Sequence, residues 1–259
     1  MDRDRLSLNL ITVDHWSLPK AVDRCAAAGI RAVAPWRHRI AEIGLERSAR
    51  AIRDAGLAIS SLCRGGFFTA AGADADNRRA VQEAAALGAP VLVLVCGPPT
   101  TRDLAAARAK IAAGIERLLP YAADHGVRLG IEPLHPMMIG ERSAIVTLGE
   151  ALALARELDS PHVGVVVDSY HVFWDPALED ELGAARGLIA GYHVSDWLVP
   201  TTDLLAGRGL MGDGIIDFAR LHRLMDGAGY AGPIEVEIIN PAVAGRPRLL
   251  EDIVDRFTA

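Results

Sequence analysis

The stretch His125-Gly126-Val127-Arg128-Leu129-Gly130-Ile131-Glu132-Pro133 contains the pattern on which the fold depends. A glycine ends an amphipathic segment, a short apolar run follows, and the run closes on a carboxylate. Glycine is the usual residue at the left-handed position that ends a helix, and a short apolar run is typical of a strand buried on both faces of a parallel sheet. The stretch therefore predicts a helix-to-strand turn and a buried strand with an acidic end.

This pattern recurs along the chain. Glycine also stands between a helical segment and an apolar run at Gly29, Gly56 and Gly88. Amphipathic stretches that we expect to be helical include residues 18–28, 77–87, 103–125 and 147–158. Apolar runs that we expect to be strands cover residues 6–11, 30–35, 57–62, 90–96, 127–132, 163–168, 188–194 and 234–239.

Eight alternations of strand and helix fit either a doubly wound sheet or a closed barrel. A doubly wound nucleotide-binding fold needs a glycine-rich fingerprint after its first strand, and residues 11–16 contain no glycine. The length of 259 residues suits one barrel of roughly 250 residues. We therefore predict an α/β fold, a single (β/α)8 TIM barrel over residues 1–259. The long connection at residues 197–214 follows the seventh strand, where a lid is expected.

The composition narrows the class of protein. Lys and Arg total 27 against 33 Asp and Glu, for a net charge of −6 and no basic run, which disfavours nucleic acid as a partner. No apolar run approaches the roughly 18 residues of a membrane span, and the charged N-terminus lacks a signal core. The widely spaced Cys25, Cys63 and Cys96 indicate reduced thiols and a cytoplasmic protein. The expected partner is a small molecule, and the sequence leaves open whether the chain forms a homo-oligomer.

Four consecutive expected strands carry side chains that can bind a metal at their ends. The fifth ends on Glu132, the sixth ends on Asp168, the seventh carries His193, and the eighth carries Glu235 and Glu237. Functional residues of a barrel lie at the carboxyl ends of its strands, so we expect these side chains to converge. The side-chain period of two puts Glu235 and Glu237 on one face of their strand and does not choose between them.

Buried carboxylates need a compensating charge. None of these strands contains a lysine, so a divalent cation would supply that charge. Taken alone, a strand-end glutamate is more often an ion-pair partner, and a histidine in an apolar strand is more often a hydrogen-bonded core residue. Four such residues on consecutive strands together favour one metal site. Its three carboxylates and one imidazole suit Mn²⁺ best, with Mg²⁺, Co²⁺ or Zn²⁺ as alternatives.

The order of these motifs resembles the xylose isomerase-like superfamily of sugar phosphate isomerases and epimerases, which includes ketose 3-epimerases, hydroxypyruvate isomerase and endonuclease IV. The resemblance spans the chain in strand order and is strongest from residue 130 to residue 240. Its markers are residues 130–134 (GIEPL), 167–171 (VDSYH), 192–196 (YHVSD), 211–214 (MGDG) and 229–237 (GYAGPIEVE).

The resemblance implies roles for individual residues. The family binds its metal through Glu, Asp, His and Glu at the ends of strands five to eight, which here match Glu132, Asp168, His193 and Glu237. It thereby selects Glu237 over its neighbour two positions earlier. It also implies that Glu132 and Glu237 are the acid/base pair on opposite faces of the substrate. His171 is implied to lie beside the metal as a substrate or outer contact.

Some positions depart from the relatives. Met138 stands where ketose 3-epimerases carry a second glutamate, and Val199 stands where they carry an arginine that grips the sugar. The further histidine ligands of the three-zinc endonucleases are missing, because strands two and three end in Pro35-Trp36-Arg37 and Cys63-Arg64 and the loop histidine aligns with Arg208. The enolising machinery is therefore expected to be kept, whereas the epimerase sugar contacts are not.

We expect a divalent-metal-dependent sugar isomerase or epimerase that removes a proton next to a carbonyl through a metal-stabilised enediolate. The alternatives are a lyase that eliminates from the same enediolate, a metal-dependent hydrolase or nuclease, and a non-catalytic sugar-binding barrel. Arg208 could hold a phosphate or carboxylate, or could cap its loop. The residues expected to contact the substrate are His171, Arg208, His15, Trp36, Arg64, His135 and Trp174.

Overall fold

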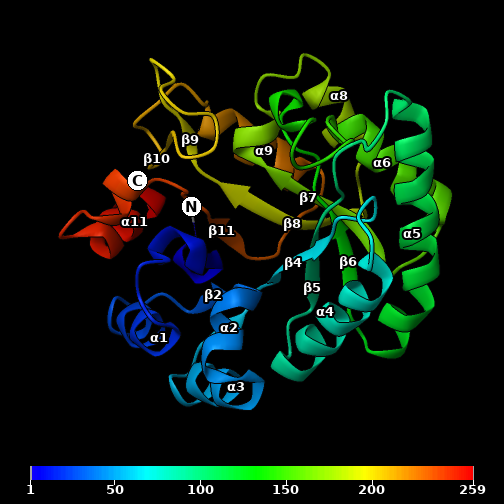
Figure 1. Ribbon diagram of the computed structural model, residues 1–259. Coiled ribbons are helices and arrows are strands. Elements are labelled where there is room, and N and C mark those ends of the chain that lie inside the picture. The colour runs from blue at the N-terminus through cyan, green and yellow to red at the C-terminus, as the bar shows by residue number, and fades with distance from the viewer. Residues whose placement is uncertain (1, 259) are drawn as a thin grey trace.

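The computed structural model describes residues 2–258, whose parallel strands form the wall of one (β/α)8 barrel with helices around it (Figure 1). In the sheet the strands follow the order β3, β2, β1, β11, β8, β7, β6, β5, β4. Their bounds are β1 Leu6–Asn9, β2 Ala32–Ala34, β3 Ala58–Ile59, β4 Leu62–Gly66, β5 Val91–Val95, β6 Arg128–Ile131, β7 Val163–Asp168, β8 Ile189–Val194 and β11 Ile234–Val236.

The helices follow the strands in the expected alternation. The long helices α4, α5 and α6 begin and end close to the expected segments, although α4 starts four residues before residue 77. In Figure 1 the C-terminal helix α11, in red, lies beside the N-terminal segment. The helices are α1 Leu18–Ala27, α2 Arg37–Ile43, α3 Leu45–Asp54, α4 Ala73–Leu87, α5 Leu104–Asp124, α6 Leu148–Leu158, α7 Ser169–Val172, α8 Leu178–Gly183, α9 Phe218–Gly227, α10 Pro241–Ala244 and α11 Leu249–Thr258.

One split strand closes the ring. β3 pairs with β2, in the register Ala32 to Ala58, whereas β4 pairs with β5, in the register Leu62 to Leu92. A parallel bridge from Trp36 to Cys63 adds to this junction. Because β3 and β4 belong to one continuous segment, that segment joins the two edges of the sheet. It acts as the third of eight barrel strands.

The apolar side chains of the strands divide between two regions. Alternate residues of a strand point to opposite faces, and in β5 this places Leu92 and Leu94 in the large core between strands and helices. Val93 lies on the other face, where it forms a small separate cluster with Val166 and Cys63. The continuous apolar runs thus reflect burial on both faces, as expected for a parallel barrel.

The expected strand at residues 57–62 was too short at its carboxyl end. The strand continues to Gly66, so Arg64 lies within β4 and not beyond it. Gly65 and Gly66 pass close to β5, and a Cβ at Gly66 would collide with the backbone carbonyl of Val95. Two glycines that look like a turn in the sequence are therefore part of the barrel wall.

The connection after β8 is partly ordered by a short ribbon. β9 (Asp196–Trp197) pairs antiparallel with β10 (Arg208–Gly209). The Asp196 carboxylate accepts hydrogen bonds from the backbone N–H groups of Gly212, Gly214 and Ile216 at 2.8–3.0 Å. The long connection at residues 197–214, where a lid is expected, therefore comes back to the barrel at Arg208.

None of the helices within residues 2–258 combines the length and the apolar character that a membrane crossing requires.

We expect Gly66→Ala to lower the free energy of unfolding by about 3 kcal/mol or more, because the new methyl group has no space and φ at Gly66 is +107°. Urea unfolding followed by circular dichroism measures the loss. Gly140→Ala is the matched control, since no heavy atom lies within 4 Å of its Cβ position. Equal stability of the two variants would contradict the close approach of β4 to β5.

Candidate functional site

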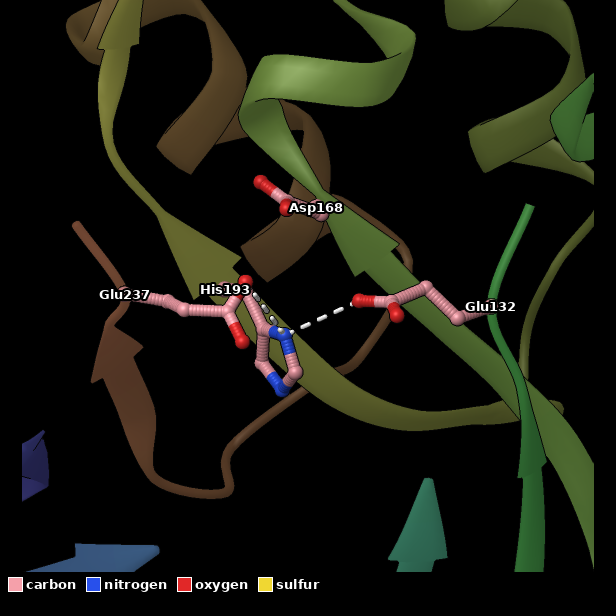
Figure 2. A group of neighbouring side chains, drawn as sticks. All are labelled: Glu132, Asp168, His193 and Glu237. Atoms are coloured by element: carbon pink, nitrogen blue, oxygen red, sulfur yellow. Dashed lines mark ion pairs between the residues drawn. The ribbon is translucent and has the colours of Figure 1, made fainter. Parts of the chain in front are cut away.

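Four side chains from neighbouring strands meet at the carboxyl end of the barrel. Glu132 directly follows β6, Asp168 ends β7, His193 lies in β8, and Glu237 directly follows β11. One ligand atom from each lies within 4.8 Å of the others, and all four residues are buried. Figure 2 shows Glu132 and Glu237 reaching toward the His193 ring from opposite sides, with Asp168 above it. The structure therefore brings together the four residues that the strand ends and the resemblance selected.

The His193 ring separates the two glutamates of the last strand. Its Nδ1 lies 3.1 Å from Glu132 Oε1 and 3.9 Å from Glu237 Oε2. Its Nε2 lies 3.1 Å from Glu235 Oε2. Glu235 is held in turn by Asn9, whose Nδ2 donates to Oε2 at 3.3 Å. Glu237 thus belongs to the cluster of four, whereas Glu235 lies behind the imidazole and orients it.

The contact between Glu132 and His193 is not aligned as a hydrogen bond. Glu132 Oε1 and His193 Nδ1 face the cluster, are buried and have no hydrogen-bond partner within residues 2–258. An unsatisfied buried polar atom costs about 1–3 kcal/mol, so two such atoms that face one point need a further partner. Three carboxylate oxygens and one imidazole nitrogen form a donor set that fits a divalent cation.

Arg208 supplies part of the compensating charge. Its Nη1 lies 2.9 Å from Asp168 Oδ2 and 2.9 Å from Glu237 Oε2, and the residue is only 2% exposed. Asn240 Nδ2 donates to its backbone carbonyl at 2.8 Å and holds it in place. The alternative of a loop cap was therefore wrong: the guanidinium is buried between two carboxylates of the cluster. It lies where a substrate oxygen could also reach it.

The site remains negatively charged despite Arg208. Burial alone would raise the pKa of Asp168, but the Arg208 charge keeps that pKa below its usual value. Burial raises the pKa of Glu237 to about 7 although Arg208 opposes the shift. Burial alone would lower the pKa of His193, yet Glu235, Glu132 and Glu237 together raise it well above its ordinary value. The carboxylates therefore attract positive charge, whether as protons or as a metal cation.

His171 faces the same cluster from α7. The backbone N–H of His135 donates to its Nδ1 at 3.2 Å. Its Nε2 lies 3.5 Å from Asp168 Oδ2 and 3.2 Å from Nη2 of Arg208, a side chain that can only donate. Burial lowers the pKa of His171 to about 3, which keeps the ring neutral. The ring therefore presents Nε2 beside the acidic cluster.

A small cavity opens beside the cluster. Of the residues expected to contact the substrate, it brings together His171, Arg208, Trp36 and Arg64. The Trp36 indole donates to Asn9 Oδ1 at 2.6 Å. The cavity wall is thus connected through Asn9 to Glu235 and to the His193 ring.

Three other expected contact residues do not line this cavity. His15 is exposed and borders a separate groove beside α10. His135 and Trp174 pack against each other, with ring centroids 5.5 Å apart. The Trp174 indole donates to the backbone carbonyl of His171 at 2.7 Å, so this pair supports the segment that carries His171. Strand-end position and aromatic character could not distinguish these rim residues from wall residues.

Two residues of the site were missed. Asn9 ends β1, and the strand-end criterion that found the acidic residues could have found it too. Arg142 lines the cavity from the loop after β6, and no motif or periodicity points to it. Its place depends on the loop fold, where Gly97 N–H donates to Arg142 O at 2.9 Å.

Comparison with known proteins agrees with this architecture. The sequence profile of the xylose isomerase-like TIM barrel family matches residues 22–258. The chain belongs to this family. Protein SMc04130 from Sinorhizobium meliloti 1021, whose crystal structure is known, is 44% identical in sequence to this chain. It superimposes with a TM-score of 0.95, covering 99% of this chain and 98% of that chain.

Two curated relatives are similar over shorter stretches. The L-ribulose 3-epimerase of Methylomonas sp. (strain DH-1) is 29% identical over 136 residues, which are 50% of this chain and 42% of that protein. The ketose 3-epimerase of Arthrobacter globiformis is 28% identical over 145 residues, which are 54% of this chain and 44% of that protein. This xylose isomerase-like chain thus spans less than half the length of either curated relative.

Replacement of Arg208 in this xylose isomerase-like barrel should destabilise the protein, because the buried carboxylates would lose their compensating charge. We expect Arg208→Met, unfolded by urea in EDTA, to lose about 3–5 kcal/mol, because two buried carboxylates lose their partner. Arg220→Met is the control: its ion pair with Glu179 has a similar length of 3.0 Å but is exposed, so about 0–1 kcal/mol is expected. Similar losses in both variants would show that Arg208 does not neutralise the cluster.

Proposed function

We propose that this protein is a divalent-metal-dependent isomerase or epimerase of a keto-sugar or sugar derivative. The observation that carries the proposal is the buried convergence of Glu132, Asp168, His193 and Glu237 within 4.8 Å, at the wall of a cavity. The family supports it, and so do the two relatives named as 3-epimerases. One barrel over residues 1–259 would carry the whole site.

The four clustered residues would hold one ion, with Mn²⁺ preferred and Mg²⁺, Co²⁺ or Zn²⁺ as alternatives. When bound, the ion would polarise the substrate carbonyl and acidify the neighbouring C–H. Glu235 faces His193 Nε2 at 3.1 Å, which leaves Nδ1 directed at the cluster. Such a carboxylate behind a histidine fixes the orientation of the ring.

Glu132 and Glu237 would transfer the proton. They approach the centre from opposite sides (Figure 2), and both line the cavity. One carboxylate can therefore remove a proton from one face of the substrate, while the other returns a proton to the opposite face.

The remaining polar groups would hold the substrate. The neutral His171 presents its Nε2 beside Asp168, and Arg208 adds a buried cation between two carboxylates. Trp36 and Arg64 complete part of the cavity wall. Oxygen atoms next to the reacting carbon would therefore meet donors on one side and carboxylates on the other.

The direct test is incubation of the protein, loaded with Mn²⁺ and assayed for metal content, with a panel of ketoses and keto-sugars in D₂O. We expect one ion per chain and deuterium entry next to a carbonyl in the proton NMR spectrum. The position of the label and the product distinguish epimerisation from isomerisation or elimination. A substrate that binds but never exchanges would refute proton abstraction.

Glu132→Gln and Glu237→Gln should each lower the exchange rate at least about 10²-fold, because each removes a carboxylate that transfers a proton. Metal content is measured in parallel, since each substitution also removes a ligand. Glu116→Gln, on the exposed face of α5, is the control and should exchange like the wild type. Wild-type exchange in either site variant would remove that glutamate from the mechanism.

His171→Ala should weaken substrate binding more than metal loading. The lost Nε2 contact is expected to raise KM up to about tenfold, since a hydrogen bond between neutral groups contributes about 0.5–1.5 kcal/mol. Isothermal titration with Mn²⁺ and steady-state kinetics separate the two effects. Loss of Mn²⁺ affinity with an unchanged KM would instead make His171 a metal ligand.

A further inference from the structure

Two arginines without a role in metal binding or proton transfer line the cavity of the acidic cluster. Arg64 and Arg142 both line it, as Glu132 and Glu237 do. Arg64 lies in β4, and its guanidinium carbon is 4.2 Å from the centre of the Phe67 ring. This stacking fixes the plane of the guanidinium and leaves its N–H groups free to donate.

Arg142 lies on an ordered loop. Its carbonyl accepts from Gly97 N–H, and Ala144 N–H donates to the Gly97 carbonyl, both at 2.9 Å. A parallel bridge from Gly97 to Ser143 fixes the same segment to the end of β5. Since β4 and β5 are neighbours in the sheet, the two arginines come from adjacent parts of the barrel rim.

Neither guanidinium has an acidic partner. Across residues 2–258, no carboxylate lies within 4.0 Å of Arg64 or Arg142, whereas the nearby Arg37 pairs with Asp76 and Glu83, and Arg208 pairs with two carboxylates of the cluster. Burial and the charge of Arg142 lower the pKa of Arg64. Two like charges on one cavity wall repel each other, and an anion between them would remove this cost.

The rest of the described lining offers little to a neutral sugar. Apart from the acidic cluster with its His171 and Arg208, the wall is mainly apolar, with Val93, Leu134 and Met138 among its residues, and it includes no Asn, Gln, Ser or Thr. Sugar hydroxyl groups need hydrogen-bond partners when they are buried. Such partners are therefore scarce between the cluster and the two arginines.

We infer that the substrate is an acidic keto-sugar derivative, whose carboxylate or phosphate is bound by Arg64 and Arg142 while its carbonyl end lies at the acidic cluster. The carbonyl end of this substrate is inferred from the proposed function. Its anionic end is inferred only from the two unpaired arginines. Arginine forms planar, charge-assisted hydrogen bonds that suit both oxyanions.

The test compares three probes by isothermal titration with Mn²⁺-loaded protein: D-fructose, D-fructose 6-phosphate and 5-keto-D-gluconate. We expect at least one of the two anions to bind about tenfold or more tightly than fructose, and the tighter one identifies the oxyanion as phosphate or carboxylate. Arg64→Gln and Arg142→Gln should each lower the affinity for that anion about tenfold or more. Fructose, which carries no oxyanion, should lose much less affinity than the anion in both variants.

Matched variants separate charge from structure. Arg117→Gln removes an exposed arginine of α5 that pairs with Asp74 and should bind all three probes like the wild type. Arg64→Lys and Arg142→Lys keep the charge and should recover part of the affinity. Thermal unfolding shows that each variant is folded. Equal affinity for fructose and both anions, or glutamine variants with unchanged anion binding, would overturn the inference.

Deuterium exchange with the same probes separates this inference from the proposed function. Exchange with fructose alone would keep proton abstraction and overturn the acidic substrate. Arginine-dependent binding of an anion without exchange would keep the anion site and overturn the isomerase. Deuterium exchange with one of the anions, together with loss of that exchange in Arg64→Gln and in Arg142→Gln, would support the inference and the proposed function alike.

Discussion

The site depends on an excess of buried carboxylates held at one end of the barrel. Glu132, Asp168, Glu235 and Glu237 are each at most 5% exposed, and an isolated buried carboxylate is costly. Arg208 offsets part of this charge through contacts of 2.9 Å to two of them. The remainder raises the proton affinity of the groups that stay unpaired. This imbalance favours the binding of a cation.

The barrel makes this imbalance possible because it brings distant residues to one rim. All strands of the ring are parallel, so residues as far apart as 132 and 237 end at the same edge. The wall is stabilised by apolar packing on both faces of the strands, independently of the polar rim. The fold can therefore tolerate unpaired polar atoms at the strand ends, where they serve binding and not stability.

The sequence predicts the fold and the cluster well, because both follow from local patterns. Apolar runs punctuated by glycine identify the strands, and a carboxylate or histidine at the end of a run identifies Glu132, Asp168 and His193. Residues on loops are different, because their positions depend on tertiary contacts. The ribbon that carries Arg208 to the centre is ordered by hydrogen bonds of Asp196 across 16–20 positions of sequence. Arg142 reaches the cavity on a segment whose Ser143 forms a bridge with Gly97, just after β5.

The charges at the two ends of the cavity would also orient a substrate. An acidic keto-sugar placed with its anion toward Arg64 and Arg142 presents its carbonyl end to Glu132 and Glu237. The reversed orientation would place the anion against buried carboxylates, where like-charge repulsion is strong because solvent screening is weak. Discrimination thus arises from repulsion at one end as much as from attraction at the other. An acidic substrate would thus be oriented by the groups at both ends of the cavity.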